Sequence, residues 1–195
     1  MEYPCLGAVR VNLESVIFFT DGVITARPYQ AEDLPEVYAA VCESQNEPFF
    51  WSVDLKGLSQ PDVQTYIESQ PKIWNEDIAY NFVILDSSSN GIQGGCGLTH
   101  INRRHRTCSL YYWIRNGSTG KGYATRAVIL MARFAFDSLG MRRMEIMIEP
   151  ENLAGLRVVE KAGAISEGYL RSRFFHHGDS KDVVLFSLLP EDLSA

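Results

Sequence analysis

A glycine-rich segment between a strand-like run and a helix-like run restricts the fold of this chain more than any other feature. The run Thr107–Ile114 (TCSLYYWI) is rich in the β-branched and aromatic residues that strands favour. Glycines follow at positions 117, 120 and 122, and a helical pattern then runs from about residue 123 to residue 139, where Gly140 stops it. A further strand-like run begins at Arg143. A strand, a tight loop, a helix and a second strand predict a parallel crossover within a mixed α/β sheet.

The head of that helix is also a predicted anion-binding site. The first turn of a helix leaves backbone N–H groups without partners, and the helix dipole adds partial positive charge. Gly120 and Gly122 have no side chains that would keep a ligand from the backbone, and Lys121 and Arg126 add positive charge. The common nucleotide motifs G-x-x-x-x-G-K-[ST] and G-x-G-x-x-G are absent. The residues alone leave two alternatives, a phosphate or diphosphate site and a tight turn without a ligand.

The remaining patterns predict a single domain around one sheet. Strands are expected at residues 23–28, 78–86, 91–100, 107–115, 143–149, 167–175 and 181–188, and further helices at 31–44, 60–74 and 152–162. We therefore expect an α/β fold whose sheet has six to seven strands, mostly antiparallel, with a central parallel pair and helices on both faces. Residues 1–22 are predicted to be an N-terminal extension in which an extra strand is one option. Residues 23–189 are predicted to be the domain and residues 190–195 a C-terminal tail.

Composition narrows the class of protein. With 195 residues the chain suits one core, and its formal charge of −6 disfavours a nucleic-acid-binding module, which normally carries excess basic charge. The basic run Arg103–Arg106 is expected to be a solvated strand connection, with attraction of an acidic substrate as the alternative. Four widely spaced cysteines without ligand histidines nearby argue against a metal site or a disulfide framework. No apolar run is long enough to span a bilayer and no signal peptide is recognisable, so we expect a cytoplasmic protein.

Four segments, in order along the chain, resemble motifs of one superfamily. The string GKGYA at Gly120–Ala124, after the strand YYWI, resembles motif A of the GNAT superfamily of N-acetyltransferases. NLAGLRVVEKAG at Asn152–Gly163 is similar to the N-x-x-S-x-x-V-x-x-K-x-G-F helix of the ribosomal-protein N-terminal acetyltransferase (Rim-type) branch, and EGYLR at Glu167–Arg171 resembles the strand that follows there. ITARP at Ile24–Pro28, with EDL at Glu32–Leu34, resembles the opening of that branch. The resemblance implies a GNAT-like single domain over nearly the whole chain.

The resemblance also implies acetyl-CoA as cosubstrate, without a metal. In that family the loop amides bind the pyrophosphate of coenzyme A, and the pantetheine arm lies between two splayed parallel strands, here 109–115 and 143–149. The residues that map to the cofactor are Gly120, Lys121, Gly122, Tyr123 and Ala124 at the pyrophosphate, Ile114 and Arg115 at the strand end that meets pantetheine, and Asn152 and Lys161 on the other side. For Lys161, the alternative is a solvated lysine on the helix surface.

The implied chemistry is direct attack of an amine on the acetyl thioester, without a covalent enzyme intermediate. An amine is protonated near neutral pH, so a base or a desolvating channel must release its electron pair, and a backbone N–H of the strand before the loop is expected to stabilise the oxyanion. Three positions depart from the family pattern: Thr119 replaces Gln or Arg, Gly155 replaces the serine of the branch, and Val159 replaces the tyrosine of other members. Both customary proton donors to the thiolate are therefore missing. Tyr112 and Tyr123 are candidate substitutes, with core tyrosines as the alternative.

The sequence does not single out the general base. Glu149 ends the second splayed strand and Glu47 lies in an aromatic loop expected to face the acceptor, with a surface carboxylate as the alternative for each. His100 ends a central strand near the acceptor side, with a buried structural histidine as the alternative, and Trp51 is either channel wall or core. The candidate catalytic residues are thus Asn152, Glu149 and Tyr112, and the candidate substrate-binding residues are Glu47, Trp51 and His100.

The branch resemblance implies acetylation of the α-amine of a protein or peptide. Two alternatives stay open: acetylation of a small amine such as a polyamine, amino acid or aminoglycoside, and a coenzyme A-binding sensor that has lost turnover, suggested by Gly155 and Val159. A deep acidic pocket is expected for a polycation and an open groove for a peptide. No nucleic-acid or membrane partner is expected, and a homodimer is one option, because the N-terminal extension could pair between subunits.

Overall fold

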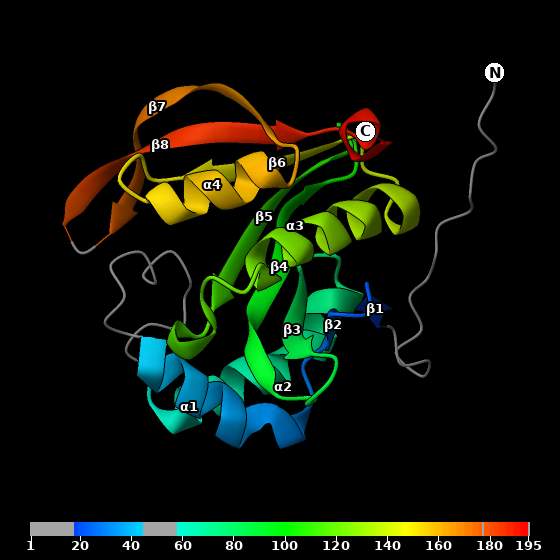
Figure 1. Cartoon of the computed structure of the whole chain (residues 1–195), viewed down its shortest axis with the longest axis vertical. Helices are drawn as coiled ribbons and strands as arrows, with labels where there is room; N and C mark the ends of the chain where they lie inside the picture. The colour runs from blue at the N-terminus through cyan, green and yellow to red at the C-terminus, as the bar shows by residue number, and fades with distance from the viewer. Residues whose placement is uncertain (1–17, 45–57, 177, 195) are drawn as a thin grey trace.

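A mixed sheet of eight strands forms the centre of the computed structural model, which describes residues 18–44, 58–176 and 178–194. The strands lie in the order β1-β2-β3-β4-β5-β6-β8-β7 (Figure 1). All neighbouring strands are antiparallel except β5 and β6, which are parallel. The strands are β1 (Phe19–Thr20), β2 (Ile24–Pro28), β3 (Tyr80–Asp86), β4 (Ile92–Asn102), β5 (Thr107–Ile114), β6 (Arg143–Ile148), β7 (Ile165–His176) and β8 (Asp179–Leu188).

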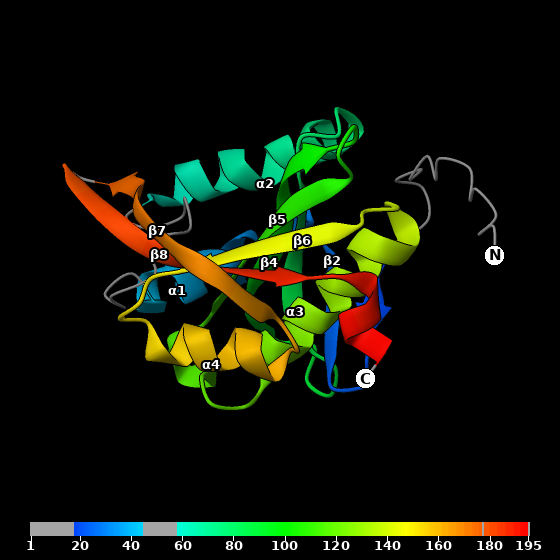
Figure 2. The same ribbon diagram turned by 90° about the horizontal axis from the view of Figure 1, so that it is seen from above.

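Helices cover both faces of this sheet (Figure 2). On one face, α1 (Leu34–Ser44) and α2 (Gln60–Asn75) pack through residues such as Val37 and Val63 against β3 and β5. On the other face, α3 (Tyr123–Arg133) and α4 (Leu153–Lys161) complete a larger apolar core. The mixed α/β fold with helices on both faces is therefore confirmed.

The central parallel pair opens toward the carboxyl ends of its strands. β5 and β6 are paired only from Thr107 and Arg143 to Leu110 and Ile146. β5 nevertheless continues for four residues to Ile114, and β6 for two residues to Ile148. Beyond the last pair, main-chain N–H and C=O groups of β5 face the space between the strands. The predicted splayed parallel pair is thus present, and its opening is the frame of the candidate site.

The structure differs from the sequence prediction in four details. The sheet has eight strands instead of six to seven, because β1 adds to its edge within the predicted N-terminal extension, most of which lies outside the described residues. The first predicted helix begins with a 3₁₀ turn, Ala31–Asp33. The helical pattern over residues 123–139 becomes α3 followed by a π-helical turn, Phe134–Ser138, and the predicted tail contains the 3₁₀ helix Pro190–Ser194.

The helices differ in how the backbone N–H groups at their starts are hydrogen-bonded. α2 begins after Ser59, whose backbone N–H donates to Asp62 Oδ2 at 2.9 Å in a capping box. α4 begins after Asn152, whose Oδ1 accepts the N–H of Gly155 at 2.8 Å. α3 begins after Gly122, which has no side chain for this purpose. Its first N–H groups are therefore the ones that a ligand can use.

Candidate active site

The loop before α3 has a backbone shaped to receive an anion. Gly120 and Gly122 have φ angles of +77° and +80°, which lie in the left-handed region that favours glycine. A Cβ added at either position would meet no atom within 4 Å, so the space over the loop is open. The first N–H groups of α3 lie at this loop, where the helix dipole is positive. The junction therefore fits a diphosphate.

Tyr123 anchors this loop with its side chain. Its hydroxyl donates to Asp86 Oδ2 at 2.5 Å, across to the end of β3. Hydrogen bonds from Ser88 and Tyr123 hold the pKa of the Asp86 carboxyl well below its usual range, and the bond to Asp86 raises the pKa of Tyr123. The Tyr123 hydroxyl proton is thus used in the hydrogen bond to Asp86. A ligand at the loop would therefore contact Tyr123 through its backbone.

A cleft of about 1350 Å³ leads from this loop along the gap between β5 and β6. Ten of the residues predicted from the sequence for the site line it, so segments far apart in the chain converge here. They are Gly120, Gly122, Tyr123, Ala124, Ile114, Tyr112, Glu149, Asn152, Lys161 and His100. Two others, Glu47 and Trp51, lie outside the described residues.

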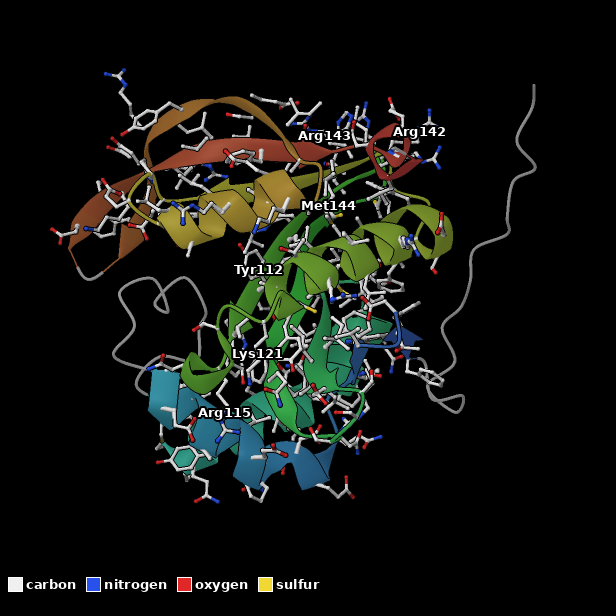
Figure 3. All side chains as sticks on the ribbon, in the orientation of Figure 1. Tyr112, Arg115, Lys121, Arg142, Arg143 and Met144 are labelled. Atoms are coloured by element: carbon white, nitrogen blue, oxygen red, sulfur yellow. The ribbon has the colours of Figure 1, made fainter. Side chains whose placement is uncertain are left out.

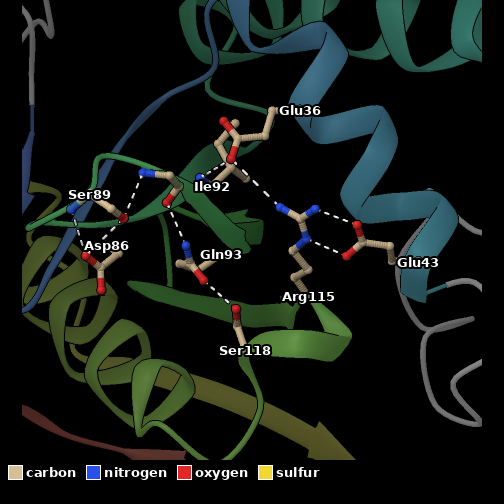
Figure 4. A network of polar contacts seen from close by, with 9 residues as sticks. Glu36, Glu43, Asp86, Ser89, Ile92, Gln93, Arg115 and Ser118 are labelled. Atoms are coloured by element: carbon tan, nitrogen blue, oxygen red, sulfur yellow. Dashed lines mark hydrogen bonds and ion pairs between the residues drawn. The ribbon is translucent and has the colours of Figure 1, made fainter.

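Arg115 and Lys121, which Figure 3 labels, were also predicted to meet the cofactor. Neither residue lines the cleft. Arg115 Nε and Nη2 each lie 2.5 Å from a carboxylate oxygen of Glu43, and Nη1 lies 3.8 Å from Glu36 Oε1 (Figure 4). Lys121 Nζ lies 5.9 Å from the centroid of the Tyr123 ring. The Arg115 side chain therefore connects β5 to α1.

Two further contacts fix the loop, and the sequence did not indicate either. The Ser118 hydroxyl donates to Gln93 Oε1, while Gln93 Nε2 donates to the carbonyl oxygen of Gly91 at 3.0 Å (Figure 4). The backbone N–H of Asn116 donates to Ser44 Oγ at 3.1 Å. The loop is thus held from β4 and from α1 before any ligand binds.

Tyr112 and Gly155 meet where the family pattern places its proton donor. The Tyr112 hydroxyl lies 3.4 Å from the carbonyl oxygen of Gly155. Burial raises the pKa of Tyr112, so the hydroxyl keeps its proton near neutral pH. A Cβ on residue 155 would lie 2.8 Å from Asn152 Nδ2. Glycine at this position therefore makes room for the Asn152 cap of α4.

The exposure of two candidate residues on the acceptor side argues against the structural alternatives that were open for them. Glu149 is only 9% exposed and borders the cleft just beyond β6, so it is not a surface carboxylate. His100 is exposed, with a φ of +50° at an irregularity between β4 and β5, and its Nδ1 lies 3.1 Å from Thr99 Oγ1. It is therefore not a buried structural histidine.

The cleft wall toward α2 contains a hydrogen-bonded group that the sequence reading missed. Tyr66 Oη and Tyr111 Oη lie 3.1 Å apart, and the Tyr111 hydroxyl donates to Asn81 Oδ1 at 2.9 Å. Asn81 Nδ2 donates to Gln70 Oε1 at 2.7 Å. We call these four residues the α2 wall network. Only the glycines of β4, which leave space beside these side chains, carried a sequence signal for it.

Within the described residues, 18–44, 58–176 and 178–194, no group of three or more His, Cys, Asp or Glu residues is placed to hold a metal ion. None of the helices there combines the length and apolar character that crossing a membrane requires.

Comparison with known proteins agrees with this geometry. The family model of the acetyltransferase (GNAT) domain matches residues 24–165. YjcK of Bacillus subtilis, a probable N-acetyltransferase, is 30% identical over 177 residues, which cover 87% of this chain and 95% of YjcK. The spermidine N(1)-acetyltransferase of Escherichia coli K12 is 30% identical over 168 residues, 83% of each chain.

A solved structure shares the fold. The ribosomal-protein-S5-alanine acetyltransferase of Vibrio fischeri aligns with a TM-score of 0.77 over 91% of this chain and 98% of its own, at 18% identity. The family model covers most of the chain, and the glycine loop, the splayed strands and the cleft have the arrangement expected from the resemblance. The chain belongs to the acetyltransferase (GNAT) domain family, and it is an acetyl-CoA-dependent N-acetyltransferase.

Proposed function

We propose that this protein acetylates the α-amine of a protein or peptide. The observation that carries the proposal is the charge of the cleft. Of the described residues, two carboxylates line it: Asp21, which is paired with Arg126 at 2.7 Å beside α3, and Glu149. A polyamine needs several carboxylates along its length, whereas a peptide brings a single α-ammonium group to the reaction. One carboxylate on the acceptor side suits the peptide.

Basic residues support binding of coenzyme A in the other half of the cleft. Four of them line it from α3 and α4. Phosphate groups are favoured by such charges and by the head of a helix. The four residues are Arg126, Arg133, Arg157 and Lys161.

The proposed reaction uses two groups that border the cleft. Glu149 takes a proton from the acceptor ammonium, and the freed nitrogen attacks the thioester carbonyl carbon. A backbone N–H of β5 beyond Leu110 stabilises the oxyanion, since that part of the strand no longer pairs with β6. As the C–S bond breaks, Tyr112 donates its proton to the departing thiolate, and the nitrogen loses its second proton to solvent, which leaves the neutral amide on the acceptor. Solvent then returns a proton to Tyr112 and takes the proton from Glu149, so that charge and atoms balance with one proton released per turnover.

Acetylation of a small amine is the second candidate, and the sequence similarity to a spermidine N(1)-acetyltransferase favours it. The third alternative, a sensor without turnover, was suggested by Gly155 and Val159, but it does not agree with the assignment of the chain as an acetyl-CoA-dependent N-acetyltransferase. The closeness of Tyr112 to Gly155 supports turnover over the sensor. Membership of the Rim-type branch, a cytoplasmic location and a homodimer stay predictions.

Release of free thiol from acetyl-CoA, measured with a panel of amines, tests the proposal. The panel contains short peptide amides with free α-amines, the same peptides blocked at that amine, a lysine side-chain amine, amino acids and spermidine. We expect the highest kcat/KM for a free α-amine and no release with the blocked peptides. A kcat/KM for spermidine at least tenfold above that of every peptide would replace the α-amine with a polyamine. Binding of CoA in calorimetry without thiol release for any acceptor of the panel would contradict both candidate acceptor classes.

A further inference from the structure

The α2 wall network is built into the fold at the point where the splayed strands part. Tyr111 is the first residue of β5 beyond its last pair with β6. Neighbouring residues of a strand point to opposite faces, so Tyr112 reaches α4 while Tyr111 reaches α2. The two tyrosine side chains therefore lie on either side of the strand segment at which the thioester is expected.

Two of the glycines of β4 leave space for this network and for the aromatic side chains beside it. A Cβ at Gly97 would overlap Asn81 Oδ1 and the ring of Tyr111, and a Cβ at Gly95 would overlap the Tyr29 hydroxyl and the Trp113 indole nitrogen. Glycine inside a strand makes the strand less stable. Two glycines on one face of a central strand are therefore unfavourable unless those positions must lack a side chain. The space that they leave is filled by the network and the aromatic residues beside it.

One backbone carbonyl sets the direction of every hydrogen bond in the network. Gln70 Nε2 donates to the carbonyl oxygen of Tyr66 at 2.7 Å, and a carbonyl can only accept. Gln70 Oε1 must then face Asn81, which turns its NH₂ to Gln70 and its Oδ1 to Tyr111. Gln70 is 1% exposed and Asn81 5% exposed, so a reversed amide would leave a buried polar group unsatisfied.

The orientation of the two amides also fixes which of the two tyrosine hydroxyls donates to the other. The Tyr111 proton goes to Asn81 Oδ1, so Tyr111 Oη can only accept from the Tyr66 hydroxyl 3.1 Å away. The Tyr66 hydroxyl proton is thus used in the bond to Tyr111, so any group that Tyr66 Oη binds in the cleft that it lines must be a hydrogen-bond donor. The Tyr29 ring packs edge-on against the Tyr66 ring, with centroids 5.5 Å apart, and helps to hold it.

We infer that Tyr66 Oη binds an N–H of the acceptor amine and that Gln70 and Asn81 are positioning residues that keep it an acceptor. The inference rests on the proposed function, since it concerns the amine in the same cleft. A primary amine keeps two N–H donors when its lone pair attacks. Binding one of them at Tyr66 holds the amine beside β5 equally before and during its attack on the thioester carbon.

The variant Tyr66→Phe tests the inference with acetyl-CoA, a tripeptide amide with a free α-amine, and spermidine as a second acceptor. Loss of one hydrogen bond made equally before and during the reaction raises KM for the amine about fivefold to tenfold. We expect kcat to stay within twofold and the Kd of CoA, measured by calorimetry, to stay unchanged. Tyr169→Phe is the matched control, because its hydroxyl donates to Asp182 at 2.8 Å on β8, outside the cleft lining.

Gln70→Met tests the positioning role, since it removes the amide at similar length. Its acceptor KM is expected to rise as in Tyr66→Phe while the Kd of CoA stays the same, whereas a merely structural role would move both constants. An unchanged acceptor KM in Tyr66→Phe, with wild-type turnover intact, would overturn this inference and leave the proposed function standing. If the wild-type protein binds CoA but acetylates neither acceptor, both the proposed function for these amines and the inference are overturned.

Discussion

The guanidinium of Arg115 contacts both carboxylate oxygens of Glu43, at 2.5 Å each, and so joins the end of β5 to the last turn of α1. The next residue, Asn116, donates its backbone N–H to Ser44 Oγ at 3.1 Å. The start of the loop before α3 is therefore held at two adjacent points by one helix. The hydrogen bond from Arg115 lowers the pKa of Glu43, so the contact is complete above the usual carboxyl range and weakens as the pH falls below it.

The variant Arg115→Gln is expected to raise the Kd of CoA about threefold to tenfold, because the loop loses one of its anchors. The free energy of unfolding should fall by less than about 1 kcal/mol, since Glu43 is partly exposed and the pair is screened by solvent. Calorimetry with CoA measures the first effect. Arg103→Gln is the control, because it breaks a similar pair with Asp77 away from the loop. Equal Kd values in the two variants would show that Arg115 does not support the loop.

The variant Gly122→Ala is expected to weaken CoA binding at least tenfold. A Cβ there projects into the open space over the loop, and the φ of +80° adds backbone strain of about 1 kcal/mol. Gly178→Ala is the matched control: its φ is +87° and its Cβ also meets open space, but it lies at the turn before β8. Both variants should lose similar stability in urea unfolding. Only Gly122→Ala should lose CoA affinity, and a similar loss in the control would refute a local role.

The sequence predicted those parts of the molecule whose signals are local. The glycines at 120 and 122 stand next to the helix they precede, and the alternation of β5 is visible within eight residues. The strand order near the crossover followed from one strand, one helix and the next strand. Asn152 was found from a family motif, whereas Tyr112 and Glu149 were found from their places on the two predicted splayed strands.

The remainder depends on contacts between distant segments. Nothing near Arg115 indicates that Glu43, 72 residues earlier, would take its side chain. Gln70 and Asn81 belong to an ordinary helix and an ordinary strand, and their pairing appears only when α2 lies over β3. The exposure of His100 also depends on a local irregularity of β4 that no residue pattern marks.

The variant Tyr112→Phe is expected to lower kcat about tenfold to a hundredfold, if its hydroxyl protonates the thiolate, without changing the Kd of CoA. Steady-state thiol release and calorimetry measure the two constants. Gly155→Ser, which restores the serine of the branch, should not raise kcat. Its Cβ would displace Asn152 and lose the α4 cap, at a cost of about 1 kcal/mol. A full rate in Tyr112→Phe would assign the proton to water.

The variant Asp33→Ala is expected to destabilise the protein by about 3–5 kcal/mol, because Arg27 would remain as a buried charge without its partner. The two side chains are 7% and 16% exposed, and they form two hydrogen bonds of 2.7 Å. Glu76→Ala is the control, since its pair with Lys72 is exposed and should be worth less than about 0.5 kcal/mol. Urea unfolding compares the two. A small effect at Asp33 would mean that water reaches Arg27.

Acid should weaken the protein partly through Glu167, on β7. The Arg143 guanidinium lowers the pKa of this carboxyl from 4.5 to about 2. A lowered folded-state pKa stabilises the protein fully above the unfolded value, and this contribution is lost as the pH falls from about 4.5 toward 2. Glu167→Gln should therefore flatten the decline of unfolding free energy over that range, and Arg143→Gln should do the same. The side chain is 36% exposed, so the difference from wild type should shrink in high salt. Chemical unfolding at several pH values measures this slope, and a slope equal to that of the wild type in both variants would exclude the pair as its source.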